Sequence, residues 1–216
     1  FLSGVVIAVF GFMMRKGLEH EVVPDHPGRH AIPLLDALRN HRRGMVCAIG
    51  IAAFNAAAFY LMLVYITTYL TTIVGQDEQV AFDINTANMA ILVLLIPLWG
   101  WISDRVGIQK VLLTSVTIAI FATIPLFALI DHVNPLYEFL GQLGMVLLLA
   151  PYLSCFATRM AFLFPASIRM SAFSTTYNIG LAIFGGTAPL VASYLIERDV
   201  GEFSPAYLLT GAAVLS

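Results

Sequence analysis

Two uncharged runs of twenty residues, separated by a short polar turn, constrain this chain more than any other feature. Residues 84–103 and 111–130 contain no Asp, Glu, Lys or Arg, and about twenty helical residues at 1.5 Å each cross the hydrocarbon of a bilayer. The turn between them, with Asp104, Arg105 and Lys110, is therefore expected at a membrane face. With 59% hydrophobic and only 11% charged residues, the chain is expected to be a polytopic membrane protein.

Several other classes of protein are disfavoured. A net charge of -2 gives no reason to expect nucleic-acid binding, and Cys47 and Cys155 both fall in apolar runs, which predicts no disulfide framework. The spans hold no Ser-His, Cys-His or Asp-Asp pairing, so we expect no catalytic residues, no cofactor and no enzyme. His26 and His30 are separated by a Pro-Gly pair that disfavours a helix, so we expect no metal site.

Polar and apolar segments divide the chain into three predicted parts. Residues 1–14 are read as the end of a spanning helix, residues 15–43 as a polar loop with a short interfacial helix near 32–39, and residues 44–216 as a helical bundle. Five whole spans and the start of a sixth are expected at residues 44–76, 79–100, 108–130, 135–158, 170–196 and 205–216. Because both ends of the chain interrupt apolar runs, we expect a fragment.

The basic residues predict the orientation of these spans. Alternate loops at residues 15–43, 101–110 and 159–169 hold ten of the eleven Lys and Arg residues, and the opposite side holds only Arg198. Loops rich in Lys and Arg face the cytoplasm in multi-pass proteins. We therefore expect these three loops to be cytoplasmic, in a plasma membrane or bacterial inner membrane.

The turn at residues 100–110 has further chemical features. Gly100 permits close approach of a neighbouring helix, and Gly107 can adopt a positive φ that reverses the chain. Asp104 is expected to accept backbone N–H bonds at a helix N-terminus, while Arg105 and Lys110 stay in water. The alternative is a generic cytoplasmic turn, which would account for the charged residues without any special role.

The full pattern G-x-x-S-D-R-x-G-x-x-K between two spans resembles the loop motif of the major facilitator superfamily. The resemblance implies an all-α membrane fold of twelve helices in two halves, with this turn between helices eight and nine. The chain would then run from the end of helix six to the start of helix twelve. Ile108 and Gln109 depart from the motif, which favours basic residues at these positions.

Two other regions are similar to the metabolite:proton symporter branch, which includes proline/betaine, 2-oxoglutarate, citrate and shikimate carriers. The first is the polar loop, with Leu18-Glu19, Pro33-Leu34, Ala37-Leu38-Arg39 and His41, although His20 and the insert at residues 22–30 depart from it. The second is the region of helices ten to twelve, at residues 164–169, 177–180, 184–190 and 205–207.

The resemblance implies a secondary active transporter, a proton symporter that takes up a small polar organic acid or zwitterion by alternating access. It would work in the bilayer as a monomer, with Gly100, Asp104, Arg105, Gly107 and Lys110 as a conformational switch. A transporter fold used as a sensor, which binds ligand without flux, is the alternative. The spans lack a deep Lys or Arg, which favours a zwitterion, although the other half could supply a cation.

Polar residues at depth are the candidates for lining a substrate site. They are Asn55, Tyr60, Asn85, Asn88, Gln142, Tyr177 and Asn178. Each could instead do no more than hydrogen-bond a neighbouring helix.

Two smaller groups complete the candidates. Pro189 cannot donate to the carbonyl of Gly185, so we expect a bend at Gly185, Gly186 and Pro189, either as a gate or as a static kink. Asp83 is the candidate for proton coupling, with a helix-start acid as the alternative. Glu138 has a similar position and a weaker claim, and we expect the main coupling groups in the other half.

Overall fold

The computed structural model describes residues 9, 12, 13, 33–198 and 203–216. Contacts divide the chain into two units, residues 1–31 and residues 32–216. Residues 15–32 of the predicted loop at residues 15–43 lie outside the described residues, and so does most of the predicted helix end at residues 1–14. The fold is therefore that of the second unit.

The second unit is an all-α bundle, as expected, and five of its described helices are long and apolar enough to cross a membrane. The first long helix runs unbroken over Arg42–Val74. Its parts are α3 (Arg42–Phe59), η1 (Tyr60–Tyr65), α4 (Ile66–Tyr69) and η2 (Leu70–Val74), where η denotes a π-helical segment. The remaining elements are α2 (Pro33–Asn40), α5 (Glu78–Val106), α6 (Ile108–Ile130), α7 (Pro135–Phe162), α8 (Arg169–Gly180), η3 (Leu181–Gly185), α9 (Gly186–Glu197) and α10 (Ser204–Leu215).

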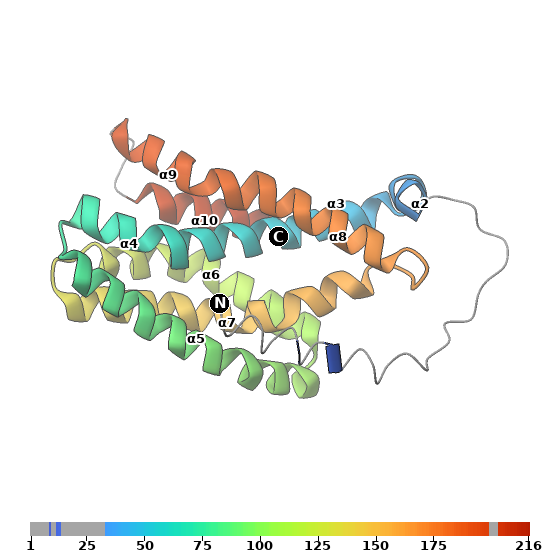
Figure 1. The fold of residues 1–216 in the computed structure, drawn as a ribbon, viewed down its shortest axis with the longest axis horizontal. Helices are drawn as coiled ribbons and strands as arrows, with labels where there is room; N and C mark the ends of the chain where they lie inside the picture. The colour runs from blue at the N-terminus through green and yellow to red at the C-terminus, as the bar shows by residue number, and fades with distance from the viewer. Residues whose placement is uncertain (1–8, 10–11, 14–32, 199–202) are drawn as a thin grey trace. The chain divides into compact units, whose positions relative to one another are not determined.

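The spans form two packed groups (Figure 1). In one, α7 packs against α5 and α6, and in the other, the Arg42–Val74 helix packs against α8, η3 and α10. Contacts between α10 and α6 and between α3 and α7 join the groups. The α5–α6 turn, the α7–α8 turn and α2 all lie at one end of the bundle (Figure 1), so the basic loops are gathered at that end. We call it the basic end, and we call the opposite end, where α5 begins at Glu78 and α6 is followed by Asp131, the acidic end.

Local chemistry explains where the spans begin and end. The Asp77 carboxylate caps α5 by accepting from the backbone N–H groups of Gln79 at 2.9 Å and Val80 at 3.4 Å. Asn134 caps α7 in the same way, accepting from the N–H of Leu136 at 3.0 Å. Gly75 ends η2 with φ 78°, a left-handed conformation that suits glycine.

The short helix expected near residues 32–39 is present as α2, but its packing differs from the expected pattern. The pattern predicts Leu38 on the apolar side, yet Leu38 is 47% exposed, while Ala37 is completely buried. The helix contacts α3 and α8. Burial of a small alanine lets α2 lie close to these helices, and its interfacial position in a membrane stays a prediction.

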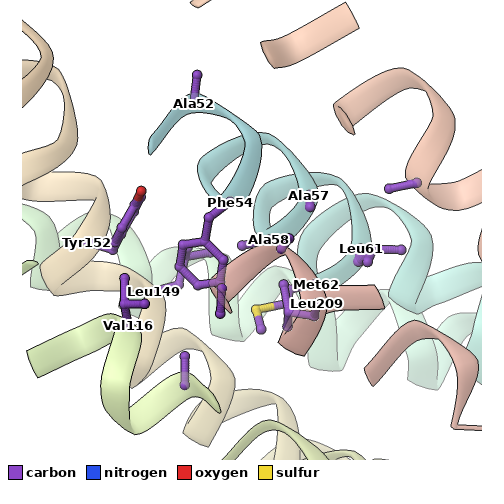
Figure 2. Close-up of a cluster of buried hydrophobic side chains, with 14 of the residues drawn as sticks. Ala52, Phe54, Ala57, Ala58, Leu61, Met62, Val116, Leu149, Tyr152 and Leu209 are labelled. Atoms are coloured by element: carbon purple, nitrogen blue, oxygen red, sulfur yellow. The ribbon is translucent and has the colours of Figure 1, made fainter. Parts of the chain in front are cut away.

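The core of the bundle lies where the two groups meet, around Phe54 of α3 (Figure 2). The Phe54 ring meets the Tyr152 ring of α7 edge-on, with centroids 4.7 Å apart. Val116 of α6 and Leu209 of α10 belong to the same cluster. Alanines fill much of the buried surface of α3, and such small side chains let spans approach closely enough for van der Waals contact.

Candidate functional site

Gln142 of α7 is the centre of a buried cluster of amides. Its Nε2 donates to Asn85 Oδ1 at 2.6 Å and to the Met62 carbonyl at 3.3 Å, and its Oε1 accepts from Asn88 Nδ2 at 3.3 Å. Gln142, Asn85 and Asn88 are 1%, 7% and 0% exposed. The cluster joins α5 and α7 to the π-helical segment η1 through neutral hydrogen bonds.

The π-helical geometry of η1 explains why carbonyl groups are available to this cluster. A π-helical turn pairs residues five apart instead of four, which shifts the backbone hydrogen bonds locally. Besides Met62, the carbonyl of Leu63 accepts from Asn85 Nδ2, at 3.1 Å. Buried carbonyls in a span need such partners because no water reaches them. Asn88 Oδ1 is buried without a hydrogen-bond partner among the described residues, so the cluster retains one open acceptor.

The other four substrate-lining candidates lie apart from this cluster. Asn55 is 4% exposed on α3, and its Oδ1 has no described hydrogen-bond partner. Tyr60 and Tyr177 are half-buried, and the Tyr177 ring stacks with Phe156, centroids 6.1 Å apart. Asn178 is exposed, and its Nδ2 donates to the Ser174 carbonyl of its own helix at 2.7 Å. The structure thus unites three of the seven candidates.

The expected N-terminal position of Asp104 is wrong. Helix α5 continues to Val106, so Asp104 lies in its last turn, where it cannot cap α6. Gly107 precedes α6, which has no side-chain cap. The positive φ expected for Gly107 is confirmed at 106°. The turn therefore reverses the chain through Gly107, and the Asp104 carboxylate is exposed at the C-terminal end of a helix.

The other residues of the turn lie at the surface or beside it. The Arg105 guanidinium is 3.6 Å from the Trp101 ring centroid, a cation–π contact. Arg105 and Lys110 are exposed, as expected. A Cβ at Gly100 would meet nothing within 4 Å. The expected close approach of a neighbouring helix at Gly100 is therefore not seen in this conformation.

Close helix approach occurs instead between the Arg42–Val74 span and the Arg169–Glu197 span. A Cβ on Gly180 would lie 2.5 Å from Ala52 Cβ, and a Cβ on Gly185 would lie 2.9 Å from the Tyr60 ring. A Cβ on Gly186 would meet nothing within 4 Å. The π-helical segment η3 ends at Gly185, one turn before Pro189. The bend at these residues stays a prediction, but the backbone register does change there.

Comparison with known proteins identifies the fold. Residues 2–216 match the Major Facilitator Superfamily. The chain belongs to this superfamily. The expected family is thereby confirmed, and the long helices are the spans of a multi-pass superfamily member. No solved structure gives a significant match.

Curated relatives of this superfamily chain are transporters. A putative proline/betaine transporter of Staphylococcus haemolyticus is 28% identical over 100% of this chain and 47% of its own length. An alpha-ketoglutarate permease of Escherichia coli is 29% identical over 89% of this chain and 45% of its own length. The ectoine/proline transporter ProP of Corynebacterium glutamicum is 30% identical over 84% of this chain and 36% of its own length. The chain spans about half the length of the first relatives it matches.

The acidic residues of this superfamily member are buried differently from what the sequence indicates. Asp83, the candidate for proton coupling within these spans, is exposed, and its carboxylate accepts from Gln79 Nε2 of its own helix at 3.0 Å. Glu138, the weaker candidate by sequence, is completely buried. Its position four residues before Gln142 puts both on one face of α7. That spacing was the available sequence signal.

Proposed function

We propose that this chain forms the C-terminal half of a secondary active transporter that takes up a small polar metabolite or osmolyte together with protons. The observation that carries the proposal is its similarity, along its whole length, to about half of a putative proline/betaine transporter. Transport by alternating access requires two halves that rock around a central site. Five described helices of this half are long and apolar enough to be its spans, and α10 is a shorter apolar helix.

The polar groups at depth favour a zwitterionic substrate. The amide cluster of Gln142, Asn85 and Asn88 offers hydrogen bonds but no charge, and the basic residues of the described spans lie near their ends. An organic acid would need a cation from the other half. In this conformation, Tyr60, Tyr177 and Asn178 are partly or fully exposed and the amide cluster is buried, so the proposal requires another conformation that uncovers the cluster for substrate.

The basic end supports two further parts of the proposal: the orientation of the spans in the membrane, and a switching role for the turn at residues 100–110. We place the loops at residues 15–43, 101–110 and 159–169 in the cytoplasm, because their Lys and Arg content matches the positive-inside rule. The membrane is then the plasma membrane, or the inner membrane of a bacterial cell. The turn at residues 100–110 is proposed to change its contacts as the halves rock.

Flux measurements on the complete transporter in proteoliposomes test this proposal. Labelled proline, betaine and 2-oxoglutarate are offered with and without an imposed pH gradient, alkaline inside. One unit of pH is worth about 1.4 kcal/mol of driving force per proton, which permits about tenfold accumulation for a one-proton symporter. We expect one of these substrates to accumulate with the gradient, and a protonophore to abolish the accumulation.

Two other results would reject parts of the proposal. Binding of a substrate without any flux would favour the sensor alternative. Flux that ignores the pH gradient and the protonophore would keep transport and reject proton coupling. Competition among the three unlabelled substrates then ranks zwitterions against organic acids.

A further inference from the structure

Glu138 is the one acidic side chain that the described residues bury completely. It lies in the first turn of α7 and is 0% exposed. Asp77, Glu78 and Asp83, near the same acidic end of the bundle, are exposed. A carboxylate withdrawn from water without a cation is strongly unfavourable, and a single bound proton removes its charge. Among the described acids, Glu138 is therefore the one for which burial most favours the protonated, neutral form.

The two oxygens of Glu138 have unequal surroundings. Oε1 accepts a hydrogen bond from Gln76 Nε2 at 3.0 Å, and the same amide donates to the Val133 carbonyl at 3.2 Å. Oε2 is buried without a hydrogen-bond partner among the described residues. The described part of the chain provides no basic side chain as an ion-pair partner for this carboxyl. A proton bound at Oε2 would neutralise the group and leave the Oε1 bond to Gln76 intact.

The elements packed against α7 bring other titratable groups toward this end. The Tyr69 hydroxyl donates to Asp131 at 2.7 Å, and the His132 ring lies 4.9 Å from the Tyr137 ring. The elements that contact α7 carry further titratable groups: Asp77, Glu78, Asp83, Asp104 and Arg105 of α5 and its cap, Arg42, Arg43 and Cys47 of α3, Tyr60 and Tyr65 of η1, Lys110 of α6, and Arg169 and Tyr177 of α8. The charged groups at the opposite, basic end are Arg42, Arg43, Asp104, Arg105, Lys110 and Arg169.

The connection that hydrogen-bonds Glu138 through Gln76 is the segment whose movement would let water reach the carboxyl. Gln76 belongs to the short connection between η2 and α5, and its backbone N–H donates to the Leu70 carbonyl at 2.9 Å. Gly75, just before it, has φ 78°. Movement of this connection would withdraw the Gln76 amide and open the carboxyl to the acidic end. On its other side, Gln142 lies one helical turn along the same face of α7 and leads to the amide cluster.

We infer that Glu138 is a proton-binding site that controls closure of the acidic end of this half. With a proton taken from water onto Oε2, the neutral carboxyl can be buried as in this structure. With the O–H bond broken and the proton returned to water, the charged carboxylate requires hydration. This requirement favours an open arrangement of the connection at Gln76. The inference rests on the proposed function, since it assigns a coupling residue to it. The competing explanation is a purely structural acceptor that ties Gln76 to α7.

Glu138→Gln separates these two explanations. The glutamine keeps an Oε1 that can accept from Gln76, but it cannot bind or release a proton. A purely structural role predicts wild-type behaviour in this variant. Asp83→Asn is the matched control, because it removes an exposed carboxylate from a neighbouring helix near the same end. Thermal unfolding of both purified variants checks that each is folded.

The first measurement does not depend on transport. Infrared difference spectra of the complete protein, recorded between acidic and alkaline pH, report the C=O stretch of protonated carboxyl groups. We expect a component of this band in the wild type and in Asp83→Asn that Glu138→Gln lacks. If Glu138→Gln does not fold, Gln76→Leu is used instead. Loss of the amide donor must then move the pH at which the component appears.

The second measurement uses proteoliposomes. We expect Glu138→Gln to lose proton-driven accumulation by about tenfold, while exchange of labelled for unlabelled substrate at equal pH stays within about twofold. Asp83→Asn should keep the wild-type dependence on pH.

The two measurements separate failure of the inference from failure of the proposed function. An infrared component that persists in Glu138→Gln, an unmoved component in Gln76→Leu, or wild-type accumulation by Glu138→Gln would overturn the inference. A component that disappears in Glu138→Gln, together with no flux in the wild type, would leave the proton site and reject the transporter.

Discussion

At the scale of single residues, the Asn and Gln side chains within the spans are of two kinds, buried and exposed, which the sequence does not distinguish. Gln142 uses both ends of its side chain, as donor to Asn85 and Met62 and as acceptor from Asn88. Asn178 bonds only its own helix and is exposed. Because buried polar groups without partners are costly, the two kinds should respond very differently to substitution.

Gln142→Leu should destabilise the protein by about 1–3 kcal/mol, because Asn85, Asn88 and the Met62 carbonyl each lose a partner in a buried site. Thermal unfolding of the purified transporter in detergent measures the loss. Asn178→Leu is the control and should change stability by less than about 0.5 kcal/mol. Equal stability of the two variants would mean that the amide cluster does not hold α5, α7 and η1 together.

At the scale of helices, the Arg42–Val74 and Arg169–Glu197 spans share two features. Both contain π-helical segments, η1 and η2 in the first and η3 in the second. They also pack against each other, with glycines of the second span against small side chains and a ring of the first. Each π-helical segment shifts the backbone register of its span. In these two spans the shifted backbone therefore lies close to the surface where the spans pack together.

Gly180→Ala should weaken this contact. Its Cβ would lie 2.5 Å from Ala52 Cβ and 3.1 Å from the Ala52 carbonyl carbon, so the two backbones would have to separate. We expect a destabilisation of about 1–3 kcal/mol, measured by thermal unfolding. Gly186→Ala is the matched control six residues along, where the new methyl group meets open space, and it should be neutral or stabilising by up to about 1 kcal/mol. A reversed order of the two variants would contradict the packing.

At the scale of the whole molecule, the basic and acidic ends have different characters. The basic end gathers α2 and the turns that hold Arg105, Lys110 and Arg169 (Figure 1). At the acidic end, side chains bridge between spans: Tyr69 bonds Asp131, and Gln76 reaches Glu138. If the proposed alternating access holds, a half that is tied at one end and has exposed polar turns at the other would rock about the turns at its basic end.

Asp104→Ala should impair this rocking without unfolding the half. The Asp104 carboxylate is exposed and has no hydrogen bond to a described residue in this conformation, so its contacts belong to another state if the switching proposal holds. We expect uptake to fall by about tenfold with the unfolding temperature nearly unchanged. Glu78→Ala, at the opposite end of α5, is the control and should keep wild-type uptake. Wild-type uptake by well-expressed Asp104→Ala would reduce the turn to a marker of topology.

The sequence by itself determined the class, the spans and the family of this protein. Apolar runs of span length have few alternatives in a bilayer, and the turn at residues 100–110 carries a motif compact enough to read directly. Positive φ at Gly107 followed from the same local chemistry. These features depend on residues that are neighbours in the chain.

Tertiary structure alone decided which polar residues meet and which are buried. Gln142 and Met62 are 80 residues apart in the chain, and the contacts of Gly180 with Ala52 and of Glu138 with Gln76 also join distant parts of the sequence. Asp104 lies in the last turn of α5 and not at a cap, because the helix continues past it. Asp83 and Glu138 look alike in sequence, but the rotation of each helix against its neighbours exposes the first and buries the second, and no local pattern specifies that rotation.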